Sequence, residues 1–172
     1  HTGDTMTGPT LGGVCPIVDT PFRDDGAVDY DGLRTLCRTL IDAGCDAAAL
    51  FGYASEFYKL TEEERDRMAE VVVEACAGEV PVVLSVTTQS THAAVREARR
   101  YADLGADALM CLPPYERDPP TDAIYDHLLS VADAVSLPVV VQYAPGSTGV
   151  ALSPSFFADL YAEAPNVNHF KI

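Results

Sequence analysis

One of the two lysines in the chain has surroundings that favour covalent chemistry. Lys171 lies in the largely apolar run Val167–Ile172, whereas Lys59 lies in a polar loop. Burial disfavours the charged form of a lysine and lowers its pKa, which produces a nucleophilic amine that attacks carbonyl compounds. The sequence leaves a second interpretation open, in which Lys171 emerges into solvent at a strand end or pairs with a carboxylate.

Other side chains that could do chemistry follow short apolar runs, where the strands of a sheet would end. They are Asp19, Thr20, the loop Gly52–Glu56, Thr87, Thr88, Tyr115, Gln142 and Tyr143. Backbone N–H groups in such loops bind carboxylates, and tyrosine can move protons, whereas glutamine only forms hydrogen bonds. If the strands are parallel, these residues meet at one edge of the sheet and predict a shared site.

The elements that would position these residues repeat along the chain. A short apolar run, a polar loop and an amphipathic helix follow each other six times, roughly 30 residues apart, which is the size of one βα unit. The runs do not alternate between apolar and polar residues, so they predict parallel strands buried on both faces. The six runs are Val14–Val18, Ala47–Phe51, Val82–Val86, Ala108–Leu112, Val139–Gln142 and Val167–Ile172.

The helices carry recognisable end signals. Thr61 and Glu64 form a capping-box pattern, and Thr121 is expected to cap a later helix. The joints Ala43–Asp46 and Leu104–Asp107 resemble each other, each with a glycine that ends a helix before an aspartate. This similarity indicates an internal repeat at the level of supersecondary structure.

These units predict an α/β fold, a TIM (β/α)8 barrel of which the chain carries about the first six βα units. There is no G-x-G-x-x-G or G-x-x-x-x-G-K motif, which argues against a nucleotide-binding fold. A closed barrel needs eight units and about 250 residues, so we expect the C-terminal part of the barrel to be missing. We expect residues 1–11 to form a flexible N-terminal tail and residues 12–172 a single barrel domain.

Composition excludes several function classes. Asp+Glu number 26 and Lys+Arg 11, so the net charge of −15 argues against nucleic acid and anionic membrane surfaces as partners. No apolar run approaches the roughly 20 residues of a membrane span. The five cysteines lie mostly in apolar runs without a C-x-x-C pair, which predicts reduced thiols, a cytoplasmic location and no metal site. We expect His92 and His127 to lie on the surface.

A series of short motifs runs through the chain from Gly12 onward. They are Gly13–Phe22, Asp24-Asp25-Gly26, Leu60-Thr61-x-x-Glu64-Arg65, Gly105-Ala106-Asp107, Pro113-Pro114-Tyr115, Pro145-x-x-Thr148-Gly149 and Phe170-Lys171. In order and spacing, this series resembles the dihydrodipicolinate synthase / N-acetylneuraminate lyase family. The resemblance implies a TIM barrel of the class I aldolase type, without metal or organic cofactor. It also implies a homo-oligomer, a tetramer or a dimer.

The resemblance also implies the chemistry. Members of this family form a Schiff base between a lysine on the sixth strand and a 2-oxo acid, typically pyruvate, and position by position that lysine is Lys171. The carboxylate-binding loop of the family, G-T-T-G-E, reads Gly52–Glu56 here and has lost both threonines. We expect Tyr53, Ala54 and Ser55 of this loop, together with Thr20, to bind the substrate.

Two further positions depart from the family pattern. Anchored on Pro145, the proton-shuttling tyrosine of the Y-N-x-P motif aligns with Gln142, and Tyr143 is its neighbour. Either Gln142 replaces the tyrosine, or a local bulge brings Tyr143 inward. His169 stands two residues before Lys171 on the same strand face and is a candidate substrate-binding residue or proton shuttle, or a packed histidine in a barrel layer.

Two functions from different classes fit these observations. The first is a Schiff-base lyase or aldolase with an altered 2-oxo acid or sugar acid substrate, in which Lys171, Gln142 and Tyr143 are the catalytic candidates. The second is a non-catalytic relative that binds a small acid or serves as a scaffold, which the lost tyrosine and threonines favour. A metal-dependent aldolase is disfavoured because the candidate ligands, Asp19, Glu56, Glu116 and His169, lack ligand-like spacing.

Overall fold

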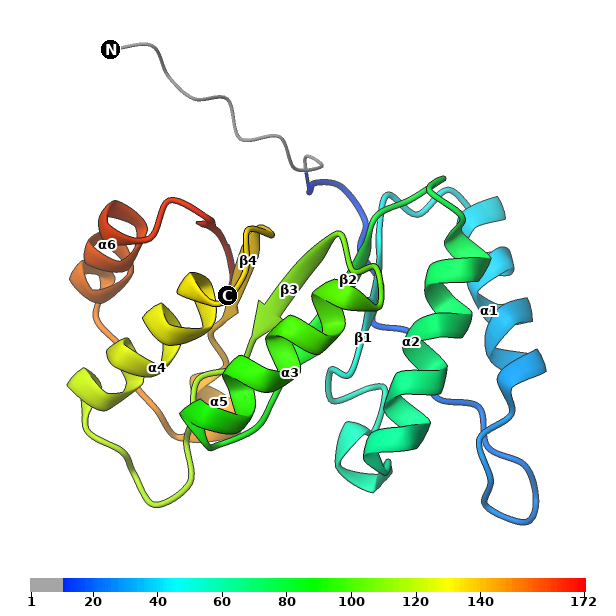
Figure 1. Ribbon diagram of the computed structural model, residues 1–172, viewed down its shortest axis with the longest axis horizontal. Helices are drawn as coiled ribbons and strands as arrows, with labels where there is room; N and C mark the ends of the chain where they lie inside the picture. The colour runs from blue at the N-terminus through cyan, green and yellow to red at the C-terminus, as the bar shows by residue number, and fades with distance from the viewer. Residues whose placement is uncertain (1–10) are drawn as a thin grey trace, which may run out of the picture.

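The computed structural model describes residues 11–172 as a parallel sheet with helices along its outside (Figure 1). The strands are β1 (Ala48–Leu50), β2 (Val82–Val86), β3 (Ala108–Cys111), β4 (Val139–Gln142) and β5 (Val167–Lys171). They are hydrogen-bonded in the order β1-β2-β3-β4-β5, and each pair is parallel. This order is the one produced by successive βα units that each add a strand at the same edge.

Helices connect the strands and pack side by side around the sheet. They are α1 (Tyr30–Asp42), α2 (Glu62–Cys76), α3 (Thr91–Asp103), α4 (Thr121–Asp133), the short α5 (Pro145–Thr148) and α6 (Pro154–Glu163), with a 3-10 turn, η1 (Phe57–Lys59), before α2. In Figure 1 they run from α1 at the right to α6 at the left, with α1 against α2, α3 against α4 and α4 against α6. The capping box of Thr61 and Glu64 is present at α2.

Successive apolar residues of β1 to β4 belong to different apolar clusters. Leu84 and Leu109 join the large core beneath the helices, whereas Val83 and Met110 join a small cluster on the inner face of the sheet. This alternation follows from the two-residue period of a strand. Both faces of the central strands are apolar and buried, as their unbroken apolar runs predict.

Two expectations need correction. The run Val14–Val18 forms only a single parallel bridge, Ile17 to Ala49, because Pro16 has no N–H to donate to a ladder. Helix α4 begins at Thr121, and Pro120 occupies the cap position. The short helix α5 was not anticipated. Most of the expected tail lies outside the described residues, but Leu11 packs against the inner cluster.

The cysteines are mostly buried, and one histidine departs from its expected position. All five thiols are free, and Cys37, Cys76 and Cys111 are buried. His92 is exposed, whereas His127 is 1 % exposed and its expected surface position is wrong. Its Nδ1 is 3.1 Å from the Thr91 hydroxyl, and its Nε2 is buried without a partner among the described residues.

The repeated helix-to-strand joint has a physical role. Asp107 Oδ2 accepts a hydrogen bond from the backbone N–H of Val82 at 2.8 Å, and its own N–H donates to the Val82 carbonyl at 2.9 Å. Asp46 makes the same two bonds to Val14, at 2.7 and 2.8 Å. Each aspartate therefore pins the start of its strand to the start of the preceding one. A Cβ at Gly13 would lie 2.0 Å from Asp46 Oδ2, so the glycine leaves room for this carboxylate.

We expect Asp107→Ala to lower the free energy of unfolding by roughly 1.5–3 kcal/mol, the range for a hydrogen bond to a charged group. The loss should appear in urea unfolding followed by circular dichroism. Asp46→Ala should cost less, because Asp46 is exposed and Asp107 is partly buried. An Asp107→Ala variant as stable as the parent protein would contradict this role.

His127 predicts a pH dependence of stability. Burial lowers the pKa of His127 below its ordinary value of 6.5, so the unfolded chain takes up a proton that the folded chain resists. The free energy of unfolding should therefore fall as the pH drops below about 6.5. His127→Gln should reduce that fall when urea unfolding is compared at pH 7 and pH 5. An unchanged difference between the two pH values would refute this assignment.

Candidate functional site

Lys171 lies at the C-terminal end of β5, where its Cα pairs with that of Gln142 on β4. Val139 pairs with Val167 but Val140 pairs with His169, so β5 contains one extra residue, Asn168, as a bulge. Val167 packs in the core beneath the helices, and a regular strand would place Lys171, four residues later, on that same side. The bulge reverses the alternation and moves His169 and Lys171 to the inner face.

The inner face is hollowed next to Lys171. A cavity of about 340 Å³ is lined by Cys15, Ile17, Ala49, Val83, Met110, Val140, His169 and Lys171, among others. Lys171 itself is exposed, because β5 is the edge strand of the sheet described here. Its position at the end of the strand is the expected one.

The structure decides between Gln142 and Tyr143. Tyr143 points toward the helix layer, where its ring centroid lies 5.1 Å from that of Phe157 in α6. Its hydroxyl contacts the backbone N and O of Leu152 at 3.3 and 3.4 Å. Gln142 is 7 % exposed and lies on the same side of β4 as Val140, which packs against the inner cluster. Tyr143 is thus a packing residue, and the expectation that it reaches the site is wrong.

Two expected substrate-binding hydroxyls are occupied inside the protein. Ser55 Oγ donates to the Val18 carbonyl at 2.6 Å and accepts from the Phe51 N–H at 3.1 Å. Thr20 Oγ1 donates to the Ser55 carbonyl at 2.6 Å. Both side chains are buried, so they hold the loop after β1 in place and do not face a ligand. Tyr53 and Ala54 are exposed at the tip of that loop.

Tyr53 has Tyr115, from the loop after β3, as a neighbour. Burial, together with this neighbour, raises the pKa of Tyr53 above its ordinary value of 10.0. The loop of Tyr115 is held by Gln89 Oε1, which accepts from the N–H groups of Tyr115 at 2.7 Å and Glu116 at 3.0 Å. The side chain of Gln89 therefore connects the loops after β2 and β3. The sequence carried no signal for Gln89, because an isolated glutamine in a loop has no pattern.

A buried acidic network supports the same edge from behind. Glu97 on α3 is 6 % exposed and contacts Arg65 at 2.8 Å, the Tyr101 hydroxyl at 3.1 Å and the Thr87 N–H at 3.4 Å. Burial raises the pKa of Glu97, and the Arg65 guanidinium opposes that shift. This carboxylate was not anticipated, because only the packed helices show that it is buried.

His169 is engaged at the other end of the cavity wall. Its Nε2 is 3.2 Å from the Leu11 carbonyl oxygen, and its Nδ1 is 2.5 Å from Asn168 Oδ1. The histidine shares a strand face with Lys171, as expected, but both ring nitrogens are occupied. This arrangement favours the packed-histidine interpretation over substrate binding or proton transfer.

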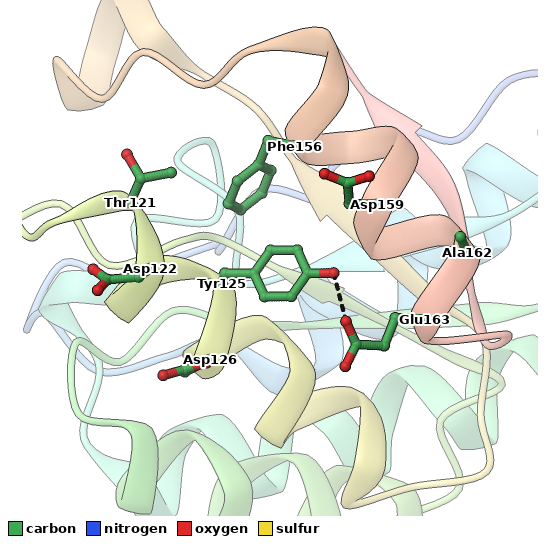
Figure 2. A pocket seen from close by; sticks show the side chains of 8 residues that line it. All are labelled: Thr121, Asp122, Tyr125, Asp126, Phe156, Asp159, Ala162 and Glu163. Atoms are coloured by element: carbon green, nitrogen blue, oxygen red, sulfur yellow. Dashed lines mark hydrogen bonds between the residues drawn. The ribbon is translucent and has the colours of Figure 1, made fainter.

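A separate hollow of about 740 Å³ lies between α4 and α6 (Figure 2). Carboxylates from both helices surround Tyr125, whose hydroxyl donates to Glu163 at 2.8 Å, as Figure 2 shows. It contains no amine and none of the residues expected at the site. In residues 11–172, no three His, Cys, Asp or Glu side chains are grouped to hold a metal ion, and no helix there is long and apolar enough to cross a bilayer.

Ser55 provides a test of the loop. Ser55→Ala leaves the Val18 carbonyl and the Phe51 N–H buried without their partner, so the free energy of unfolding should fall by roughly 1–3 kcal/mol. Ser136→Ala, at an exposed position, should change it by less than about 0.5 kcal/mol. Urea unfolding of both variants measures the contrast. Equal effects would show that the Ser55 hydroxyl does not hold the loop.

Known proteins share this arrangement. The chain matches the Dihydrodipicolinate synthetase family over residues 10–172. It is 36% identical over 166 residues to the 4-hydroxy-tetrahydrodipicolinate synthase of Haloarcula marismortui, which covers 96% of this chain and 54% of that protein. It is 35% identical over 167 residues to the L-2-keto-3-deoxyarabonate dehydratase of Azospirillum brasilense, which covers 95% of this chain and 54% of the relative.

The structural comparison agrees. The crystal structure of YagE, a dihydrodipicolinic acid synthase family protein from Escherichia coli K12 in complex with pyruvate, superposes with a TM-score of 0.88 at 29% identity. The match covers 92% of this chain and 53% of that one. The chain therefore spans about half the length of the relatives it matches. The expected fold is confirmed: residues 11–172 form part of a TIM barrel.

Proposed function

The chain belongs to the dihydrodipicolinate synthetase family, and on this basis we propose that the protein, at its full natural length, is a lyase or aldolase that forms a Schiff base between Lys171 and a 2-oxo acid. The observation that carries the proposal is the position of Lys171 at the C-terminal end of β5, on the inner face and beside Gln142. In barrels the reacting groups lie at this end of the strands. Pyruvate is the model substrate, since the Escherichia coli neighbour was solved with it.

The chemistry follows from the amine. Neutral Nζ of Lys171 attacks the C2 carbonyl of the acid, and loss of water with uptake of one proton from solvent produces a protonated imine. The imine nitrogen withdraws electrons from the adjacent carbon. A carbon–carbon or carbon–oxygen bond next to it can then form or break, which serves both aldol chemistry and dehydration.

The exposed backbone of the loop after β1 supports a role in binding the carboxylate of the acid. The N–H groups of Ser55 and Glu56 donate within the loop, to Gly52 O at 3.1 Å and Tyr53 O at 3.0 Å. The N–H groups of Tyr53 and Ala54 are at the exposed tip and make no backbone hydrogen bond within residues 11–172. We therefore assign carboxylate binding to the backbone of Tyr53 and Ala54.

Gln142 supports an altered substrate. Its amide reaches the inner face next to Lys171 and can orient a hydroxyl group or a water, but it cannot take up or release a proton. The two relatives differ in reaction, one named a synthase and the other a sugar-acid dehydratase, at nearly equal identity to this chain. A hydroxylated 2-oxo acid derived from a sugar, which offers hydroxyl groups to the Gln142 amide, fits this site better than a substrate that needs a titrating group there.

Some observations favour the second function, a relative that binds a small acid without turnover. Thr20 and Ser55 use their hydroxyls inside the protein, and Gln142 does not titrate. A binder has no requirement for a reactive amine at the strand end, however. The two functions therefore differ in whether Lys171 forms an imine.

Borohydride trapping separates them. The full-length protein incubated with pyruvate and borohydride should gain the mass of a reduced pyruvyl group, and peptide mapping should place it on Lys171. Lys171→Arg should abolish trapping and turnover, because a guanidinium stays protonated. Lys59→Arg is the matched control and should leave both unchanged, since Lys59 is exposed and ion-paired with Glu56. Trapping on Lys59, or none with any of several 2-oxo acids, would refute the Schiff-base function.

A further inference from the structure

The C-terminal end of β2 carries polar side chains that the site described above does not use. Ser85 and Thr87 follow Val83 at intervals of two residues, and Val83 packs in the cluster on the inner face of the sheet. Val86 packs on the other side, in the core beneath the helices. Because side chains alternate along a strand, Ser85 and Thr87 face inward. Thr88 agrees with this alternation, since it lines the hollow between α2 and α3 on the helix side.

The register of the sheet places Thr87 in one layer with Lys171. A row of paired residues crosses the sheet from β2 to β5, and all of its members pack in or against the core beneath the helices: Val86, Cys111, Val141 and Phe170. The next residue on each strand therefore belongs to an inward-facing layer. This layer consists of Thr87, Leu112, Gln142 and Lys171.

The two ends of this layer are within reach of one small molecule. Three strand spacings of about 4.8 Å separate β2 from β5, which amounts to roughly 14 Å along the sheet. The curvature of a barrel makes the distance across the inner face shorter than the distance along the sheet. The long side chain of Lys171 and a small 2-oxo acid bound to it therefore extend toward Thr87.

The backbone of Thr87 is held in place, whereas its hydroxyl is free. The residue is 7 % exposed, and its N–H donates to the buried carboxylate of Glu97 at 3.4 Å. Its Oγ1 has no hydrogen-bond partner within residues 11–172, whereas the hydroxyls of Thr20 and Ser55 are bonded inside the protein. Hydroxyl groups in such buried positions are normally hydrogen-bonded, because burial removes the water that would otherwise satisfy them. The Thr87 hydroxyl is therefore available to a ligand on the inner face.

Thr87 also adjoins the loop assigned above to the carboxylate of the acid. The ladder pairs Leu50 of β1 with Leu84 of β2, and Tyr53 and Thr87 each come three residues later. The N–H groups of Tyr53 and Ala54 therefore lie at the same end of the sheet as Thr87 and follow the neighbouring strand. A hydroxyl from β2 adds a side-chain donor to these backbone donors.

We propose that the Thr87 hydroxyl binds the carboxylate of the 2-oxo acid, together with the backbone N–H groups of Tyr53 and Ala54. The proposal rests on the Schiff-base function above and extends the site to a residue on a second strand. Lys171 holds the acid at C2, and Thr87 donates a charge-assisted hydrogen bond to an oxygen of its C1 carboxylate. Attachment at two points fixes the orientation of C3, the carbon at which a bond forms or breaks.

Trapping with two carbonyl compounds isolates this contact. Pyruvate carries a carboxylate and acetone does not, but an amine forms with either an imine that borohydride reduces. In the full-length protein, Thr87→Val should raise the pyruvate concentration for half-maximal trapping on Lys171 by roughly 10–150-fold, the value of a hydrogen bond to a charged group. Trapping with acetone should stay at the parent level. Thr87→Ser retains the hydroxyl and should stay near the parent value with both compounds.

Thr88→Val is the matched control, since Thr88 is the adjacent threonine and faces the helices; trapping with both compounds should be unchanged. An equal loss with pyruvate and acetone in Thr87→Val would overturn the proposal, because the hydroxyl would then act on the fold or on the lysine. Parent-level trapping in Thr87→Val with a loss in Ser85→Ala would also overturn it. The contact would then belong to Ser85, whose Oγ is buried without a partner among the described residues. Absence of trapping in the parent protein with any of several 2-oxo acids is a different result, because it refutes the Schiff-base function itself.

Discussion

The arrangement of the site depends on one extra residue in an edge strand. Side chains of a strand alternate between its two faces. The face on which Lys171 lies therefore depends on the number of paired residues between Val167 and Lys171. Asn168 is the residue that the ladder skips, and the skip places Lys171 beside Gln142 on the hollow face. The same bulge places Phe170 on the side of the helix layer, where its ring centroid lies 5.5 Å from that of Phe157. One bulge thus places Lys171 on the hollow face and Phe170 on the packed face.

Side chains at the starts of the strands maintain this registration. Asp46 and Asp107 bind the backbone of the preceding strand, and Asn166 donates its amide to the carbonyls that end α4 and precede β4. Parallel strands have no tight turn that could set their relative positions, so such polar clamps replace it. At the opposite end of the strands, the loops are held by the side chains of Ser55 and Gln89. At both ends of the strands, side-chain hydrogen bonds therefore add to those of the backbone ladder.

The fold was largely predictable, because buried parallel strands and capped helices leave strong local patterns. The bounds of β2 and β4 and the capping box at Thr61 were predicted directly. The prediction of a strand at Val14–Val18 was wrong because it relied on apolar character and not on the missing N–H of Pro16. The predicted surface position of His127 was wrong because the burial of a helical histidine depends on the position of the neighbouring helix.

The candidate site was predictable in position and less so in detail. The strand-end rule located Lys171, Gln142 and the loop after β1. The direction of each side chain depended on features that leave no trace in a single sequence: the bulge at Asn168, the packing of Tyr143 on Phe157, and the internal bonds of Thr20 and Ser55. A hydroxyl offered by a loop residue looks the same in the sequence whether it meets a ligand or a carbonyl of its own protein.

The hydroxyl of Tyr143 has a consequence beyond packing. It contacts both the backbone N and the backbone O of Leu152, nine residues later in the chain. These contacts close the segment between Tyr143 and Leu152, which contains α5, into a loop. The entropy of closing such a loop grows only slowly with its length, by about 0.6 kcal/mol per doubling. This segment can therefore lengthen, shorten or change in sequence among descendants of this protein while β4 and Gln142 stay where they are.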